Sequence, residues 1–159
     1  MTKTTNIVIR VVAVLLLVSP VAAHTLWMPV TNGPFAVMGY GLAESYGRIY
    51  LINGFVFQSA NSNQEFDPVT ATWALRANRP VSAVNVFCTA VTLPTVGFQL
   101  IFVGGGSQGW QQPLHQYYAP TDEWAARSNH AFMARSGAVA ADLRDGKMHV
   151  LGGYTDDGE

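Results

Sequence analysis

The sequence predicts an all-β chain built from antiparallel sheets that repeat about every fifty residues. Three observations predict this fold class. Apolar segments that end in glycine recur at a near-constant spacing, a proline-containing break followed by a tryptophan recurs at the same spacing, and the composition favours strands and tight turns. The 159 residues include 15 Gly, 8 Phe, 6 Tyr and 4 Trp, and only 12% are charged. Aromatic residues favour sheets, and glycine favours the turns between strands.

The charge balance and the cysteine count exclude several classes of protein. The 9 Lys and Arg against 10 Asp and Glu give a net charge of −1, so the chain lacks the cationic excess that neutralises nucleic-acid phosphates. A hydrophobic content of 49% excludes a disordered chain. Cys88 is the single cysteine, which excludes an intrachain disulfide and a cysteine-rich zinc site.

Residues 1–23 have the pattern of a secretory signal peptide. Lys3 and Arg10 precede the apolar run 11–18, and the small residues Val21 and Ala23 suit cleavage by signal peptidase. We therefore expect a protein of the secretory pathway, secreted or extracellular. The alternative is an uncleaved signal anchor, which would hold the protein at a membrane with Arg10 near the interface.

After residue 23 we expect an N-terminal arm, 24–35, to which the sequence assigns no structure, and then a repeat region, 36–159. The first repeat marker is an apolar run that ends in glycine, as in a strand buried on both faces. The distance from Gly54 to Gly105 is 51 residues, and that from Gly105 to Gly153 is 48. The three runs are 49–54, 100–105 and 148–153.

A second marker, a proline break followed by a tryptophan, has the same period. Proline cannot donate to a strand ladder and presets a turn, and a tryptophan that opens the next strand can pack between sheets. The two prolines are 52 residues apart and the two tryptophans 51. The segments are Phe66-Asp67-Pro68 with Trp73, and Tyr118-Ala119-Pro120 with Trp124. A weaker third marker is an arginine after each tryptophan, at Arg79 and Arg135.

Together the markers predict ten strands in units of four, four and two. Asp145-Gly146 is predicted as a two-residue hairpin turn between the last two strands. The expected strands are 36–42, 48–53, 63–67 and 72–76 in the first unit, 83–92, 99–103, 114–118 and 123–127 in the second, and 137–143 and 147–151 in the third.

These residues resemble the kelch repeat. In that family a hydrophobic strand ends in Gly-Gly, and a Tyr and then a Trp about six residues later follow it, at a period near 50. Gly104, Gly105, Tyr118 and Trp124 match this pattern best, and the resemblance covers roughly residues 36–154.

The departures from the kelch pattern lie in the first and third units. Asn53-Gly54 stands in place of Gly-Gly and Phe66 in place of Tyr, and the third unit carries Gly152 and Gly153 but no Tyr or Trp marker after them.

The resemblance implies an all-β fold of kelch-type β-propeller blades, about two and a half in this chain. The blades are expected near residues 36–77, 82–128 and 136–159. A propeller has about 4–8 blades, and four kelch units need roughly 200 residues. We therefore expect either a partial or truncated chain, or a unit that self-associates through exposed apolar blade faces.

The resemblance also implies a binding or scaffolding function, with another protein as the partner bound by blade loops. The candidate ligand loops are 55–63 and 107–113, and the second presents the candidate residues Gln108, Trp110 and Gln111. No catalytic residue, metal ligand or cofactor is assigned. The alternative is a secreted copper-radical oxidase resembling galactose oxidase, which needs two Tyr, two His and a Cys bonded to one Tyr.

The remaining motifs favour structural interpretations. Gly104, Gly106 and Gly109 spell G-x-G-x-x-G, but Pro113 follows and no helix is predicted, so a blade loop is favoured over a dinucleotide site. His24 at a cleaved N-terminus could chelate copper with a second histidine, for which the candidates are His115, His130 and His149. Nothing in the sequence fixes that geometry. Cys88 lies in an apolar run and is predicted to be a buried structural thiol.

Overall fold

The computed structural model describes residues 29–55, 61–106, 113–127 and 135–155. These residues form ten strands and no helix, which confirms the all-β prediction. No segment within these ranges is a helix of the length and hydropathy that a membrane span requires. The predicted signal peptide, 1–23, lies outside the described residues.

The strands form three antiparallel sheets in chain order, with four, four and two strands as predicted. Within each sheet, consecutive strands are neighbours. The first sheet holds β1 (Gly41–Ser45), β2 (Arg48–Ile52), β3 (Asn63–Asp67) and β4 (Thr72–Arg76). The second holds β5 (Phe87–Thr92), β6 (Gln99–Gly104), β7 (His115–Tyr118) and β8 (Glu123–Ala126), and the third holds β9 (Val139–Asp142) and β10 (Met148–Leu151).

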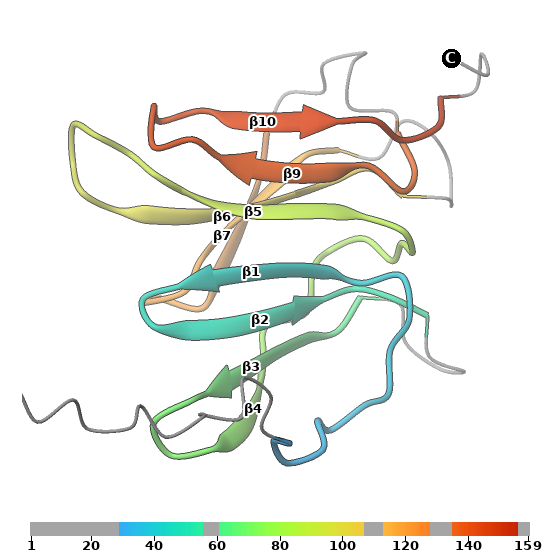
Figure 1. Ribbon diagram of the computed structural model, residues 1–159, viewed down its shortest axis with the longest axis vertical. Coiled ribbons are helices and arrows are strands. Elements are labelled where there is room, and N and C mark those ends of the chain that lie inside the picture. The colour runs from blue at the N-terminus through green and yellow to red at the C-terminus, as the bar shows by residue number, and fades with distance from the viewer. Residues whose placement is uncertain (1–28, 56–60, 107–112, 128–134, 156–159) are drawn as a thin grey trace, which may run out of the picture.

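The sheets are stacked so that their first strands lie side by side. Strand β5 contacts both β1 and β9, and Figure 1 shows β9, β5 and β1 one below another. The later strands of each sheet lie progressively further from this row of first strands. Because every sheet packs a face on the next one, alternate residues of its strands point to opposite neighbours.

Two apolar clusters fill the spaces between the sheets. The first lies between the first and second sheets and includes Tyr50 and Ile52 from one side and Ile101 and Tyr117 from the other. The second cluster joins Phe87 of β5 to Ala138, with Val150 of β10 packed against them. The core is therefore a series of interfaces between sheets, as expected for a repeat protein.

The first strand lies further along the chain than predicted. The expected strand was 36–42, and β1 spans Gly41–Ser45. Tyr46 and Gly47 both adopt left-handed φ values, 51° and 72°, and form a two-residue turn that pairs Ser45 with Arg48. This primed turn sets the register of the hairpin and draws the strand toward it.

The predicted two-residue turn at Asp145-Gly146 is wrong. Asp142 pairs with Met148, so the loop has five residues rather than two. The carboxylate of Asp142 accepts the amide of Arg144 at 2.7 Å, and that of Asp145 accepts the amide of Lys147 at 3.1 Å. These two aspartate turns, with left-handed φ at Arg144 and Gly146, lengthen the loop.

A pair of left-handed residues ends the second strand of every sheet. The φ values are 62° and 99° at Asn53-Gly54, 67° and 127° at Gly105-Gly106, and 66° and 87° at Gly152-Gly153. The amide of Gly54 donates to Ala83 and that of Gly106 donates to Arg135, so both join the segment that leads into the next sheet. The equivalent pair in the second sheet is therefore Gly105-Gly106, one residue beyond the predicted Gly104-Gly105.

We predict that the close approach at Gly105 is essential for stability, and Gly97 offers a matched control. Both residues have nearly the same φ, 67° and 68°. A Cβ at Gly105 would collide with the carbonyl oxygen of Arg135, whereas a Cβ at Gly97 would meet nothing within 4 Å. Gly97→Ala should cost only the left-handed strain, roughly 1–2 kcal/mol, and Gly105→Ala clearly more. Urea unfolding of both variants measures the difference, and equal losses would contradict the role of the contact.

Candidate functional site

The repeat markers lie at equivalent places in the first two sheets. Phe66 pairs with Trp73, and their rings are 5.0 Å apart. Trp124 pairs with Tyr117, with ring centroids 4.8 Å apart. Tyr117 is fully buried, and it rather than Tyr118 is the structural equivalent of Phe66. The turns after β3 and β7 have the same length, but Pro68 stands first in its turn and Pro120 stands second. The two prolines are therefore not structurally equivalent, and aligning the two units by their prolines shifts the alignment by one residue.

Each of these tryptophans is bonded to a segment that precedes its sheet. The indole N–H of Trp124 donates to the carbonyl of Ala77 at 2.7 Å, and that of Trp73 donates to Thr31 at 2.9 Å. The amide of Phe35 also donates to the side-chain oxygen of Gln64 at 3.0 Å. Residues 31–35, to which the sequence assigned no structure, therefore cover the outer part of the first sheet.

Arg79 lies fully buried in the segment between the first and second sheets. Its Nη2 donates to the carbonyls of Pro113 at 3.0 Å and Val103 at 3.4 Å, and its Nε to Nδ1 of His115 at 3.3 Å. Burial lowers the pKa of Arg79 to about 10, so it remains a cation at neutral pH. Arg135 makes a comparable bond to the carbonyl of Gly152 at 3.1 Å. Each predicted arginine marker thus bonds the segment between two sheets to the sheet that follows it.

An aromatic cluster of Tyr46, Phe98 and Tyr118 lies where three strand turns meet. The ring of Tyr118 is 5.7 Å from Phe98 and 6.5 Å from Tyr46. Gln99 holds the cluster together. Its side-chain Oε1 accepts the backbone amide of Tyr46 at 2.8 Å, and its backbone amide donates to the Tyr46 hydroxyl at 3.0 Å. The aromatic cluster is therefore fixed between the first and second sheets while remaining accessible.

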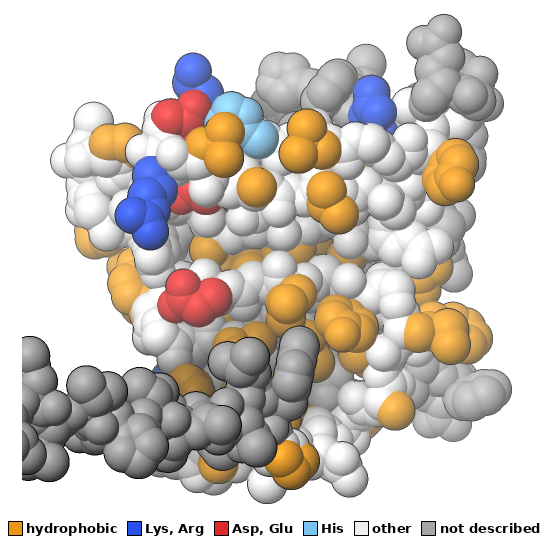
Figure 2. Space-filling view, viewed as in Figure 1, with side chains coloured by type: hydrophobic (Ala, Val, Ile, Leu, Met, Phe, Trp, Pro, Cys, Tyr) orange, Lys and Arg blue, Asp and Glu red, His pale blue; other side chains and the backbone are white. Residues whose placement is uncertain are grey.

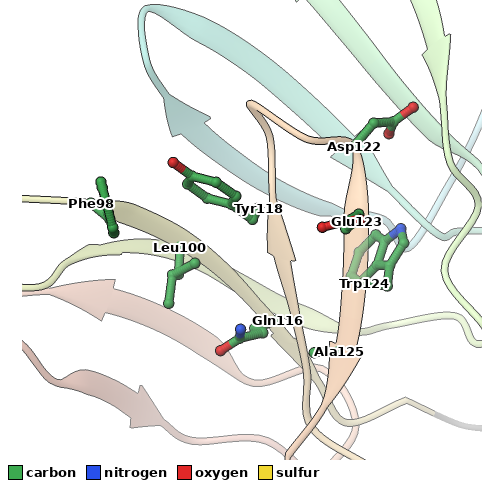
Figure 3. Close-up of a pocket in the computed structure, with 8 residues that line it drawn as sticks. All are labelled: Phe98, Leu100, Gln116, Tyr118, Asp122, Glu123, Trp124 and Ala125. Atoms are coloured by element: carbon green, nitrogen blue, oxygen red, sulfur yellow. The ribbon is translucent and has the colours of Figure 1, made fainter.

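A groove of about 710 Å³ opens beside the aromatic cluster. Figure 3 shows Phe98, Leu100 and Tyr118 along one part of it and Glu123 and Trp124 along the other. Leu100 and Tyr118 give it apolar surface, Gln116 lies between Leu100 and Ala125, and the side chain of Glu123 lies at one side, whereas that of Asp122 points away. Such a groove suits an apolar side chain that carries or neighbours a cationic group.

A polar pocket of about 350 Å³ lies on the other side of Tyr46, between the first two sheets. Arg76 donates from Nε and Nη2 to the two oxygens of Glu65, each at 2.8 Å, and the Tyr50 hydroxyl donates to Glu65 at 2.9 Å. Arg48 forms an ion pair with Asp67. The bonds from Arg76 hold the pKa of Glu65 below its usual value, although burial opposes them, while burial and the bond to Glu65 raise the pKa of Tyr50.

The opposite wall of this pocket is formed by the turn between β7 and β8. The buried hydroxyl of Tyr117 donates to Asp122 at 2.7 Å, and the amide of Ala77 donates to the same oxygen at 2.8 Å. Burial raises the pKa of Tyr117, and the bond to Asp122 adds to this. Asp122 therefore ties the second sheet to the segment that leaves the first.

The residues considered for metal or redox chemistry do not converge. Burial, followed by the charge of Arg79, lowers the pKa of His115, which keeps that ring neutral. Burial raises the pKa of Cys88 to about 12, so Cys88 is a buried thiol. His149 contacts Asp145 on the surface, 3.1 Å away. Within the described ranges, no group of three His, Cys, Asp or Glu is arranged to hold a metal ion, and His24 and His130 lie outside those ranges.

The predicted ligand-loop residues Gln108, Trp110 and Gln111 lie outside the described residues, as does Gly109 of the glycine motif. The aromatic cluster and its groove were missed by the sequence analysis. The Tyr46-Gly47 dipeptide signals a turn, but the meeting of Tyr46 with Phe98 depends on how the sheets stack, which no local pattern records.

Comparisons with known proteins agree with the repeat. The chain is 29% identical over 135 residues to Kelch-like protein 35 of Mus musculus, a match that covers 84% of this chain. The structure is similar to that of YjhT, with a TM-score of 0.62 and 20% sequence identity over 80% of this chain. The chain spans 22% of the length of the first protein and 37% of the second. No protein-family model matches the sequence.

We predict that Glu65 contributes to the pH dependence of the free energy of unfolding and that Glu65→Gln reduces this dependence. Its pKa is lowered in the folded chain, so the stability it contributes is present above its ordinary value of 4.5 and is lost as the pH falls through the lower folded value. The stability difference between neutral and acidic pH should therefore shrink in Glu65→Gln, as measured by urea unfolding at several pH values. Tyr50→Phe is the control, since it keeps the carboxylate on Arg76. An unchanged pH profile in Glu65→Gln would contradict this assignment.

Proposed function

Because the chain is built from kelch-type β-propeller blades, we propose that it binds another protein through the loops and grooves at the ends of these blades, rather than catalysing a reaction. The likeness to a kelch-like protein supports an interaction scaffold in general terms. The comparisons give no support to the copper-oxidase alternative. We propose in addition, from residues 1–23 alone, that the protein enters the secretory pathway.

The observation that carries this proposal is the accessible aromatic cluster beside the groove. Phe98 is 51% exposed and Tyr46 is 45% exposed, yet Gln99 bonds to Tyr46 at two points. Binding to side chains that are already held in place loses little conformational entropy. Tyrosine and other large aromatic residues also dominate the energetics of protein interfaces.

The groove defines the chemistry of the segment that it would bind. Leu100 and Tyr118 offer apolar surface, while Glu123 supplies a carboxylate that is solvated at the rim. We propose that the partner inserts an aromatic or aliphatic side chain next to a lysine or arginine. The rim charge would contribute to orientation and association rate more than to affinity.

Peptide selection on the purified full-length chain tests this proposal. We expect peptides from a random display library to share an apolar residue beside a cationic one. Phe98→Ala should weaken their binding by about tenfold or more, and Glu123→Lys should select against the cationic residue. Val69→Ala is the matched control, because Val69 is 90% exposed on a different turn. Equal affinity for Phe98→Ala and the control would refute the groove as the binding site.

The predicted loop 107–113 is a second candidate surface and needs its own test. We propose that Trp110 and Gln111 contact a protein partner, as the kelch resemblance implies. Replacing both with alanine should reduce capture of that partner in a pull-down, with Val69→Ala again as the control. Unchanged capture would remove this loop from the binding surface and leave the groove as the candidate.

A further inference from the structure

The outward face of the first sheet has the residues of a buried sheet interface. The register places Leu42 of β1 at the position that Cys88 occupies in β5 and Ala140 in β9. Cys88 is buried against the preceding sheet, whereas Leu42 is 56% exposed. We call this surface, formed by Leu42, Glu44, Ile49 and Leu51 of β1 and β2, the head face.

The outward face of the third sheet is its counterpart. Val139 is equivalent to Phe87, which is buried against the third sheet, but Val139 is 63% exposed and its pairing partner Leu151 is 62% exposed. Figure 2 shows hydrophobic side chains over β9 and β10 and, separately, over β1 and β2. We call the surface formed by Val139, Ala141, His149 and Leu151 the tail face.

The two faces match in extent. Residues 31–35 already cover the outer strands of the first sheet through Trp73 and Gln64, so that the head face comprises only β1 and β2. Among the described residues the third sheet in turn has two strands, β9 and β10. The tail face that these strands form can therefore lie on the head face without displacing residues 31–35.

A relay of backbone hydrogen bonds along the first strands gives the direction of stacking. The amide of Asn85 donates to the carbonyl of Gly39 at 2.6 Å, and the amide of Gly137 donates to the carbonyl of Asn85 at 2.9 Å. All three residues have left-handed φ values and stand two positions before β1, β5 and β9. The relay begins at the Gly39 amide and ends at the Gly137 carbonyl, so its two ends are a donor and an acceptor.

We propose that the head face of one copy of this chain packs on the tail face of a second copy and continues the stack of sheets. In this arrangement Leu42 packs against Val139 of the other copy, as Cys88 packs at Gly41 within one chain. The Gly39 amide then donates to the other copy's Gly137 carbonyl. Two copies joined in this way at both ends bring the three described sheets of each copy, six in all, around one axis, a number within the 4–8 of known propellers.

Sedimentation of the purified full-length chain over a wide concentration range tests the proposal. We expect a species of twice the single-chain mass, which Leu42→Asp and Val139→Asp each convert to the single-chain mass, because either buries a carboxylate in the contact. Val69→Asp, on an exposed turn, is the control and should leave the assembly intact. Both altered residues are more than half exposed, so far-ultraviolet circular dichroism should confirm that the variants still fold.

Mixing the two variants distinguishes this contact from other modes of association. Leu42→Asp keeps an intact tail face and Val139→Asp an intact head face, so an equimolar mixture should regain a two-copy species joined at one contact. A wild-type chain that stays at single-chain mass overturns the proposal, and these faces would then accept a different protein. A Leu42→Asp variant that still associates, or a mixture that fails to, overturns it as well.

Discussion

The structure depends on the close contact between one sheet and the next. A sheet of four short strands cannot shield both of its own faces, so each face needs a neighbouring sheet. The contact is closest at the first strands of the sheets, where glycine leaves room for the neighbouring segment to pack directly on the backbone. A Cβ at Gly41 would clash with Cys88, and one at Gly39 with Asn85. The apolar cluster around Tyr50 and Tyr117 can close only because the strands approach this far.

Equivalent positions of the two complete sheets carry different chemistry within the same geometry. In the first sheet, Tyr50 and Arg76 both donate to the carboxylate of Glu65. In the second, Phe102 and Gln116 stand at the positions of Tyr50 and Glu65, and Arg127 donates to the oxygen of Gln116 at 2.6 Å. Both sheets therefore have the arginine hydrogen bond, but the second sheet has neither the tyrosine hydroxyl nor the carboxylate. This pairing is consistent, since a hydroxyl that donates to a carboxylate makes a stronger, charge-assisted hydrogen bond than one that donates to an amide.

Much of the fold could be predicted because its strongest signals are local. The apolar runs that end in glycine and the tryptophans after a proline mark strand ends directly, and the four, four and two strands follow from them. The predicted bounds of the first strand, 36–42, lie too early in the chain, because the turn at Tyr46-Gly47 sets the register of the strand at Gly41–Ser45. The aromatic cluster could not be predicted, since Tyr46 and Phe98 belong to different sheets and meet only through the stacking.

The same stacking explains why the candidate binding surfaces lie where they do. Residues that face a neighbouring sheet, such as Tyr117 and Ile101, are buried in the core. A partner can therefore contact only the turns, the grooves and the outward faces of the sheets. The groove beside Phe98 lies on the face of the second sheet that packs on β9 and β10 chiefly through β5, and Leu100 and Tyr118 line it. A contact that adds sheets to the stack uses backbone geometry and apolar area, whereas a contact in the groove uses Phe98 and Glu123. The two proposed modes of binding therefore engage different residues of the chain.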